Sequence, residues 1–135
     1  MYIVYLLSKD GESMYLTLNQ GCESIRKTNS KKDTISIMRE YAQDIVLKFN
    51  NGKFKTDEDI SLGENLTERA EMYQKGTIFY KEYKKNNVPS EEILLEDLSN
   101  MMDIYSAYAD WYLNAKNDDI KSAFLKFLGP IDSLN

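Results

Sequence analysis

The first twenty residues of the chain read as a two-stranded β-unit. Residues 2–8 are apolar on both faces, as in a strand that is covered on both sides. Lys9-Asp10-Gly11-Glu12 follows, and Asp-Gly is a strong hairpin signal because glycine readily takes a positive φ. Residues 14–18 then alternate with a period of two. We expect a β-hairpin over residues 1–20, which needs further covering because an isolated hairpin is only marginally stable.

Helical periodicity dominates the remainder. An apolar face recurs at three- and four-residue spacing over residues 33–50, and the segment 64–128 reads as helical throughout. Within it we expect helices at about 65–86, 90–115 and 118–128, the first opened by a capping box of Asn65 and Glu68. Residues 52–55 fit a short third strand or a linker. The fold class expected is α+β: a hairpin packed against about four α-helices in a single domain, 1–135.

One apolar stripe in the longest expected helix has a heptad-like spacing. Its members are four and three residues apart: Leu94, Leu98, Met101, Tyr105, Tyr108, Tyr112 and Ala115. Such a stripe is typical of a seam against another helix, either within the chain or in a homodimer, and the sequence leaves both open.

Several kinds of chemistry are excluded by composition. The chain has no histidine and one cysteine, Cys22, so it lacks Ser-His, Cys-His and thiolate-zinc sites of its own. Residues 57–68 space oxygen side chains like an EF-hand loop, but Leu62 occupies the position that requires glycine. We expect no catalytic activity, no cofactor and no metal.

The cellular compartment is also predicted from features that the sequence lacks. Residues 1–8 are too short to span a bilayer and lack the features of a signal peptide. A single unpaired cysteine suits a reducing environment. We expect a cytoplasmic protein that does not enter a membrane.

The net charge is −5, and the acidic residues concentrate towards the carboxyl end. Glu92, Glu96, Asp103 and Asp110 recur at helical spacing and span about 27 Å of helix. A row of carboxylates of this length is able to imitate part of a DNA phosphate track and so to occupy a basic groove. The alternative is an ordinary solvated helix face.

Aromatic residues supply a second set of candidate contacts. The chain has ten tyrosines, five phenylalanines and one tryptophan. Tyr105, Tyr108 and Trp111 are candidate anchors for a partner, because tyrosine and tryptophan are favoured at interfaces. The alternative is that these rings form the core between two helices.

A basic segment lies between the hairpin and the first long helix. It contains Arg26, Lys27, Lys31 and Lys32, which are candidates for contact with nucleic-acid phosphates. The segment lacks interleaved aromatic residues for stacking on bases.

Three hypotheses of function follow. The first is a non-catalytic protein-interaction module, a small acidic inhibitor or antagonist of the kind encoded by mobile elements or phages. Its partner is a larger protein, one that handles nucleic acid. The second is a nucleic-acid-associated regulatory module that uses residues 26–32. The third is a small-ligand binder or a carboxylate-based enzyme. We favour the first because the usual catalytic groups are missing.

Overall fold

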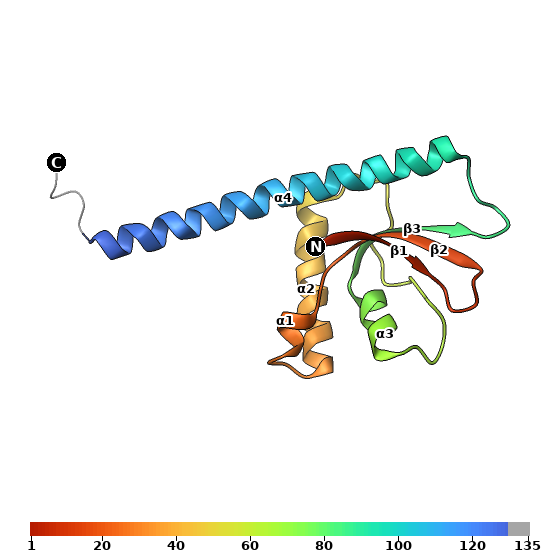
Figure 1. Cartoon of the computed structure of the whole chain (residues 1–135), viewed down its shortest axis with the longest axis horizontal. Helices are drawn as coiled ribbons and strands as arrows, with labels where there is room; N and C mark the ends of the chain where they lie inside the picture. Colours follow the sequence, from red (N-terminus) through yellow and green to blue (C-terminus); the bar gives the residue numbers. More distant parts are fainter. Residues whose placement is uncertain (130–135) are drawn as a thin grey trace.

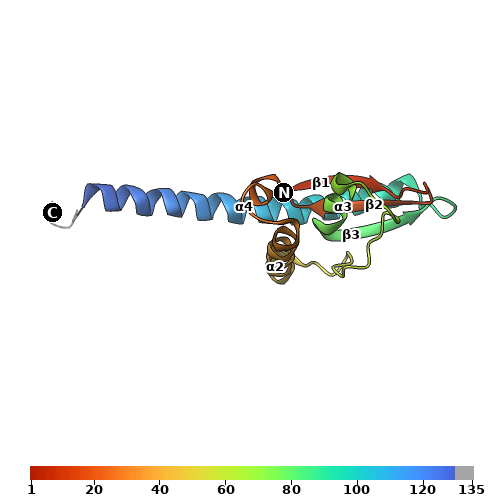
Figure 2. The same ribbon diagram turned by 90° about the horizontal axis from the view of Figure 1, so that it is seen from below.

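A computed structural model describes residues 1–129 and contains a three-stranded antiparallel sheet in the order β1-β2-β3. The strands are β1 (Tyr2–Leu7), β2 (Ser13–Asn19) and β3 (Thr77–Lys84). Helix α4 (Glu91–Leu128) crosses one face of the sheet, and α3 (Glu68–Lys75) lies under the other. Helix α2 (Lys31–Phe49) stands to one side (Figures 1 and 2). This arrangement confirms the expected α+β class.

The expected hairpin is confirmed. Leu7 pairs with Met14 next to the turn, and Gly11 takes a φ of 74° within it. The Asp10 carboxylate accepts hydrogen bonds from the Ser8 hydroxyl at 2.6 Å and from the Glu12 amide at 3.0 Å. The turn is therefore fixed by an aspartate side chain and by a glycine in the left-handed region.

The prediction of a single helix over residues 65–86 is wrong. The chain forms the short helix α3 (Glu68–Lys75), capped by Thr67 rather than Asn65, and then the strand β3. Gly76 ends the helix, and a Cβ at this position would lie 2.5 Å from Asn19 Oδ1. The β-branched and aromatic residues that follow favour a strand.

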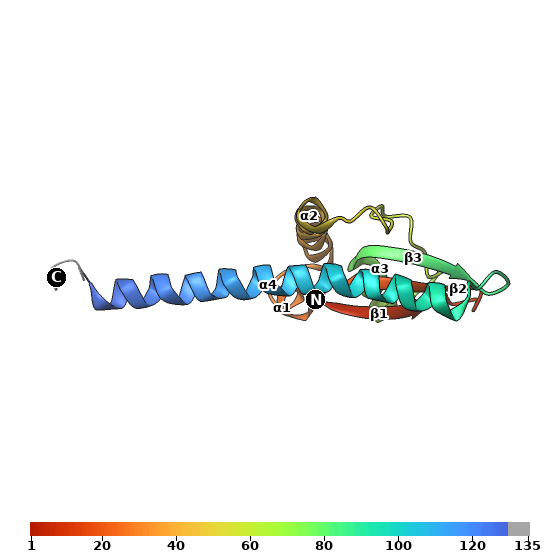
Figure 3. The same ribbon diagram turned by 90° about the horizontal axis from the view of Figure 1, so that it is seen from above.

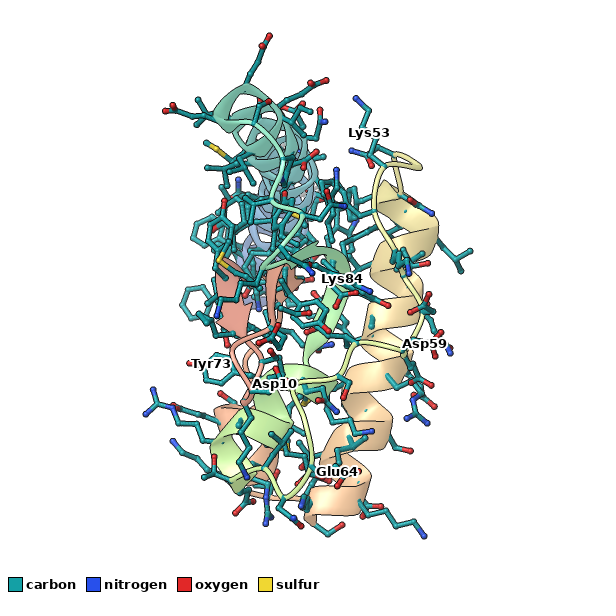
Figure 4. All side chains as sticks on the ribbon, turned by 90° about the vertical axis from the view of Figure 1, so that its right-hand side faces the viewer. Asp10, Lys53, Asp59, Glu64, Tyr73 and Lys84 are labelled. Atoms are coloured by element: carbon teal, nitrogen blue, oxygen red, sulfur yellow. The ribbon has the colours of Figure 1, made fainter. Side chains whose placement is uncertain are left out.

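Strand β3 has a short partner on its outer edge. Lys55 and Tyr80 exchange two backbone hydrogen bonds of 2.9 and 3.0 Å. Residues 52–55 thus contribute an isolated bridge rather than a full third strand. Lys53, seen at the top right of Figure 4, also donates to Asn100 Oδ1 on α4 at 3.2 Å.

The helices differ from expectation at their ends. The short helix α1 (Glu23–Arg26) lies between the hairpin and α2, where no helix was predicted. Helix α2 (Lys31–Phe49) begins two residues earlier than predicted because Ser30 caps it. Helix α4 (Glu91–Leu128) is continuous through the expected break near Asn117. Its 38 residues measure about 57 Å, so it extends well past the sheet (Figures 1 and 3). Within residues 1–129, no helix is both long and apolar enough to cross a membrane.

The main core lies between α4, α2 and one face of the sheet. Strand side chains there pack against the buried face of α4, and the cluster comprises Leu16, Leu18, Ile45, Ile78, Phe79, Tyr83, Met101, Ile104 and Tyr108. A second cluster covers the opposite face, with Leu6, Tyr15 and Tyr80 under Ile60 and Leu62 of the loop before α3. Leu94, Leu98, Met101 and Tyr108 of the apolar stripe therefore pack on the sheet and on α2 rather than along a parallel helix. Two other members of the stripe, Tyr105 and Tyr112, are exposed.

We predict that Met101→Ala lowers the free energy of unfolding by about 2–5 kcal/mol, because it opens a cavity in the main core. Met102 is 53% exposed and is the matched control, so Met102→Ala should cost less than about 0.5 kcal/mol. Urea denaturation followed by Trp111 fluorescence measures both. Equal losses for the two variants would contradict this placement of the core.

Candidate functional site

The outer face of α4 carries the four acidic residues expected from the sequence. Glu92, Glu96, Asp103 and Asp110 are all exposed. None of them forms an ion pair with any residue in 1–129. The row therefore lies open to solvent on one side of α4.

Large apolar side chains lie beside this row on α4. Leu95 and Met102 are seven residues apart and more than half exposed, and Tyr105 is 38% exposed. Methionine and tyrosine are enriched at protein interfaces, while isolated exposed carboxylates are not. The outer surface of α4 thus combines negative charge with an apolar strip, and we call these seven residues the acidic–apolar surface of α4.

Asp97 is an acid on the same helix that the sequence analysis missed. It is 8% exposed, accepts a hydrogen bond from the Tyr83 hydroxyl at 2.7 Å and pairs with Lys81 Nζ at 2.8 Å. Its burial could have been predicted from the sequence, because Asp97 lies between Leu94 and Met101 of the apolar stripe. Because both partners come from β3, Asp97 fixes α4 against the sheet.

Tyr108 was expected at the partner surface, and that expectation is wrong. It is 9% exposed, and its hydroxyl lies 2.8 Å from that of Tyr41 on α2. Tyr108 belongs to the core because it lies on the same side of α4 as Met101 and Ile104.

Trp111 lies where α4 leaves the sheet, and it is 38% exposed. Its ring packs edge-on against Phe49 of α2 at 6.1 Å between centroids, and lies 6.0 Å from Tyr108. Lys48 Nζ lies 5.4 Å from the Trp111 ring centroid. The Trp111 ring is therefore partly packed against Phe49 and Tyr108 and partly open to solvent.

Two of the four basic side chains of the segment form ion pairs within the chain. Arg26 pairs with Glu68 at 3.5 Å, and Lys31 pairs with Glu71 at 2.6 Å, both acids on α3. Lys27 and Lys32 are exposed and make no ion pair with residues in the described range. The pairing reduces the positive charge that the segment offers to phosphates.

A cavity of about 640 Å³ lies between α2, the loop before α3 and the start of β3. Figure 4 shows Asp59, which belongs to that loop, beside α2. Apolar and polar side chains share the wall: Ile35, Arg39, Ala42, Gln43, Val46, Leu47, Thr56, Asp57, Glu58, Ile60, Gln74, Lys75, Thr77 and Ile78. Arg39 and Glu58 form an ion pair at its rim.

Three buried tyrosines hold their protons strongly. Burial, and then hydrogen bonds to Asp57, Asp97 and Tyr41 respectively, raise the pKa values of Tyr80, Tyr83 and Tyr108 well above 10.0. Their phenols therefore stay neutral to a higher pH than the phenol of an ordinary exposed tyrosine. In residues 1–129, no group of three or more acidic or cysteine side chains has the geometry to hold a metal ion.

We predict that the free energy of unfolding falls as pH rises above 10. The unfolded chain then loses phenolic protons that Tyr80 and Tyr83 retain in the folded state, so stability that is complete below pH 10 is lost towards their raised pKa values. Each such group contributes up to about 1.4 kcal/mol per pH unit. Urea denaturation between pH 8 and 11 should show a shallower fall for the Tyr80→Phe/Tyr83→Phe double variant, and an unchanged slope would contradict the assignment.

Comparison with known proteins gives the family. Residues 1–110 match the family described as "MrcB-like, N-terminal domain". The match includes β1, β2, β3 and the part of α4 that covers the sheet, and it ends before residues 113–128. No curated protein sequence and no solved structure matches the chain. Because the match covers most of its residues, the chain belongs to the family of MrcB-like N-terminal domains.

Proposed function

We propose that the chain is a non-catalytic protein-interaction module that binds a larger partner through the acidic–apolar surface of α4. The observation that carries this proposal is the row of four exposed carboxylates, which form no ion pair with residues 1–129 and lie next to Leu95, Met102 and Tyr105. Apolar side chains supply contact area, and charge supplies specificity and rate of association.

The partner proposed is a protein with a basic groove, such as one that binds nucleic acid. The carboxylates from Glu92 to Asp110 extend about 27 Å along a rigid helix. Because DNA presents phosphates at regular intervals along its axis, such a row competes for a groove that accepts a phosphate backbone. The chain then acts as a small acidic antagonist, which is consistent with its net charge of −5.

A non-catalytic role is supported by the chemistry of the titratable groups. The sequence has no histidine, the side chain that most often serves as a general acid or base near pH 7. Asp97 is held by Lys81 and Tyr83 in a structural role. The Tyr83 hydroxyl that donates to Asp97 is buried with it beneath α4, so this pair is part of the packing of α4 on the sheet.

We predict that reversing the acidic row abolishes partner binding and leaves the fold intact. The variant replaces Glu92, Glu96, Asp103 and Asp110 by Lys, which changes the net charge from −5 to +3. Exposed substitutions of this kind usually alter stability by less than about 0.5 kcal/mol each. The immobilised wild type should retain a nucleic-acid-binding protein from cell lysate at low salt and release it when duplex DNA is added. The immobilised variant should not retain this protein.

The matched control reverses four exposed acids elsewhere: Glu12, Glu40, Asp44 and Glu64 to Lys. It has the same net charge as the test variant and should retain the same protein, identified by mass spectrometry. Equal retention by both variants would rule out the acidic row as the interface. If the chain itself binds duplex DNA, and Lys27→Glu/Lys32→Glu abolishes that binding, the nucleic-acid-binding alternative through residues 26–32 replaces this proposal.

A second candidate function is the binding of a small organic ligand in the cavity beside α2. Its volume of about 640 Å³ and its mixed wall support this role, because ligand pockets of about 300–1,000 Å³ are typically apolar with a few polar groups. The chemistry of the wall fits a compact ligand with an apolar body and a polar edge facing Gln43 and Arg39.

We predict that a compound library contains a ligand that raises the melting temperature of the wild type and not that of Thr56→Trp. Thr56 is an exposed residue of the cavity wall, so a tryptophan there adds a bulky ring to the wall and should weaken binding. A ligand at 100 times its Kd stabilises the folded state by about 2.7 kcal/mol. Thr28→Trp, an exposed threonine outside the cavity, is the control, and equal stabilisation of all three proteins would place the ligand elsewhere.

A further inference from the structure

The last part of α4, residues 113–128, extends beyond the sheet and α2 as a single helix (Figures 1 and 3). We call it the projecting segment. Its large apolar side chains are between 48% and 84% exposed, namely Leu113, Ile120, Phe124, Leu125, Phe127 and Leu128. An uncovered helix of this length is marginal in water, and most helical stability in proteins comes from packing of an apolar face.

The exposed apolar residues follow the spacing of a helix–helix seam. Leu113, Ile120 and Phe127 are seven residues apart, and Phe124 lies four after Ile120. At 3.6 residues per turn these four side chains lie on one side of the helix. The side differs from the one that faces the sheet, where Met101 and Tyr108 are buried. The projecting segment therefore has an apolar stripe of its own.

The charges of the projecting segment are complementary to those of a second, antiparallel copy. Its first half, residues 113–119, contains two aspartates and one lysine, whereas residues 120–128 contain two lysines and no acid. An antiparallel pair sets the negative half of each helix beside the positive half of the other. A parallel pair aligns Asp119 with Asp119 and Lys126 with Lys126, which is unfavourable.

We propose that the chain forms a homodimer through antiparallel pairing of its projecting segments. With the two-fold axis close to Ile120, Leu113 of each copy lies opposite Phe127 of the other, and the two Ile120 side chains meet at the centre. The contact extends for about 24 Å, and it holds the two sheets at opposite ends of the helix pair.

This homodimer is independent of the acidic–apolar surface of α4. Lys substitution of Glu92, Glu96, Asp103 and Asp110 should leave the dimer intact, because none of these residues lies in the projecting segment. Failure of partner binding and failure of dimerisation are therefore separate outcomes.

Sedimentation equilibrium tests the oligomeric state. The wild type should have twice the 15.7 kDa mass of one chain, and Ile120→Glu should have the mass of one chain. Ser122→Glu is the matched control, because Ser122 is exposed, lies two residues from Ile120 and faces away from the apolar stripe. This control should remain dimeric.

Disulfide crosslinking tests the direction of pairing in a Cys22→Ser background, which removes the native thiol. An antiparallel dimer predicts that Leu113→Cys mixed with Phe127→Cys gives a mixed disulfide, while each variant alone crosslinks poorly. A parallel dimer predicts the reverse.

Three results would overturn the proposal. The first is a wild type that is monomeric at high micromolar concentration, and the second is a dimer that survives Ile120→Glu. The third is a monomer that sediments with anionic phospholipid vesicles, because the projecting segment then covers its stripe with lipid. Preferred crosslinking of identical positions would overturn the antiparallel arrangement.

Discussion

Strand β2 is the element on which the other elements depend, because it is paired along both edges and covered on both faces. It bonds to β1 on one edge and to β3 on the other, and residues 15–19 are buried. Its polar side chains are used within the fold: the Thr17 hydroxyl donates to the Val4 carbonyl at 2.8 Å, and the Asn19 amide donates to the Tyr73 carbonyl at 2.9 Å. Loss of β2 therefore separates both hydrophobic clusters from their common support.

The hairpin and α2 were predictable from sequence because local signals there agree with the tertiary structure. Asp10 and Gly11 form the expected turn, and the apolar periodicity of α2 coincides with its buried face. The exposed row from Glu92 to Asp110 was also predictable, since helical spacing alone places these residues on one side.

The sequence reading placed strand β3 inside a helix over residues 65–86, because the tyrosines there also fit helical spacing. A separation of three residues, as between Tyr80 and Tyr83, puts two side chains on the same side of a helix but on opposite faces of a strand. In the fold Tyr80 joins the cluster under the loop before α3, while Tyr83 joins the main core. The stop at Gly76 and the run of β-branched and aromatic residues after it were the signals that favoured a strand. The buried role of Asp97 required knowledge of β3, because both its partners lie there.

Helix α4 has no glycine or proline between residues 91 and 128, so it contains no sequence element that favours a bend. It is anchored to the sheet by Met101 and Asp97 and to α2 by Tyr108 and Trp111, and Leu128 lies about 26 Å beyond Trp111 along the axis. The helix pair proposed above stabilises this arm, which then acts as a lever. A tilt of about 10° at Trp111 displaces Leu128 by about 4 Å. Small adjustments in the packing of α4 on the sheet are thereby converted into large movements of whatever the far end of the helix contacts.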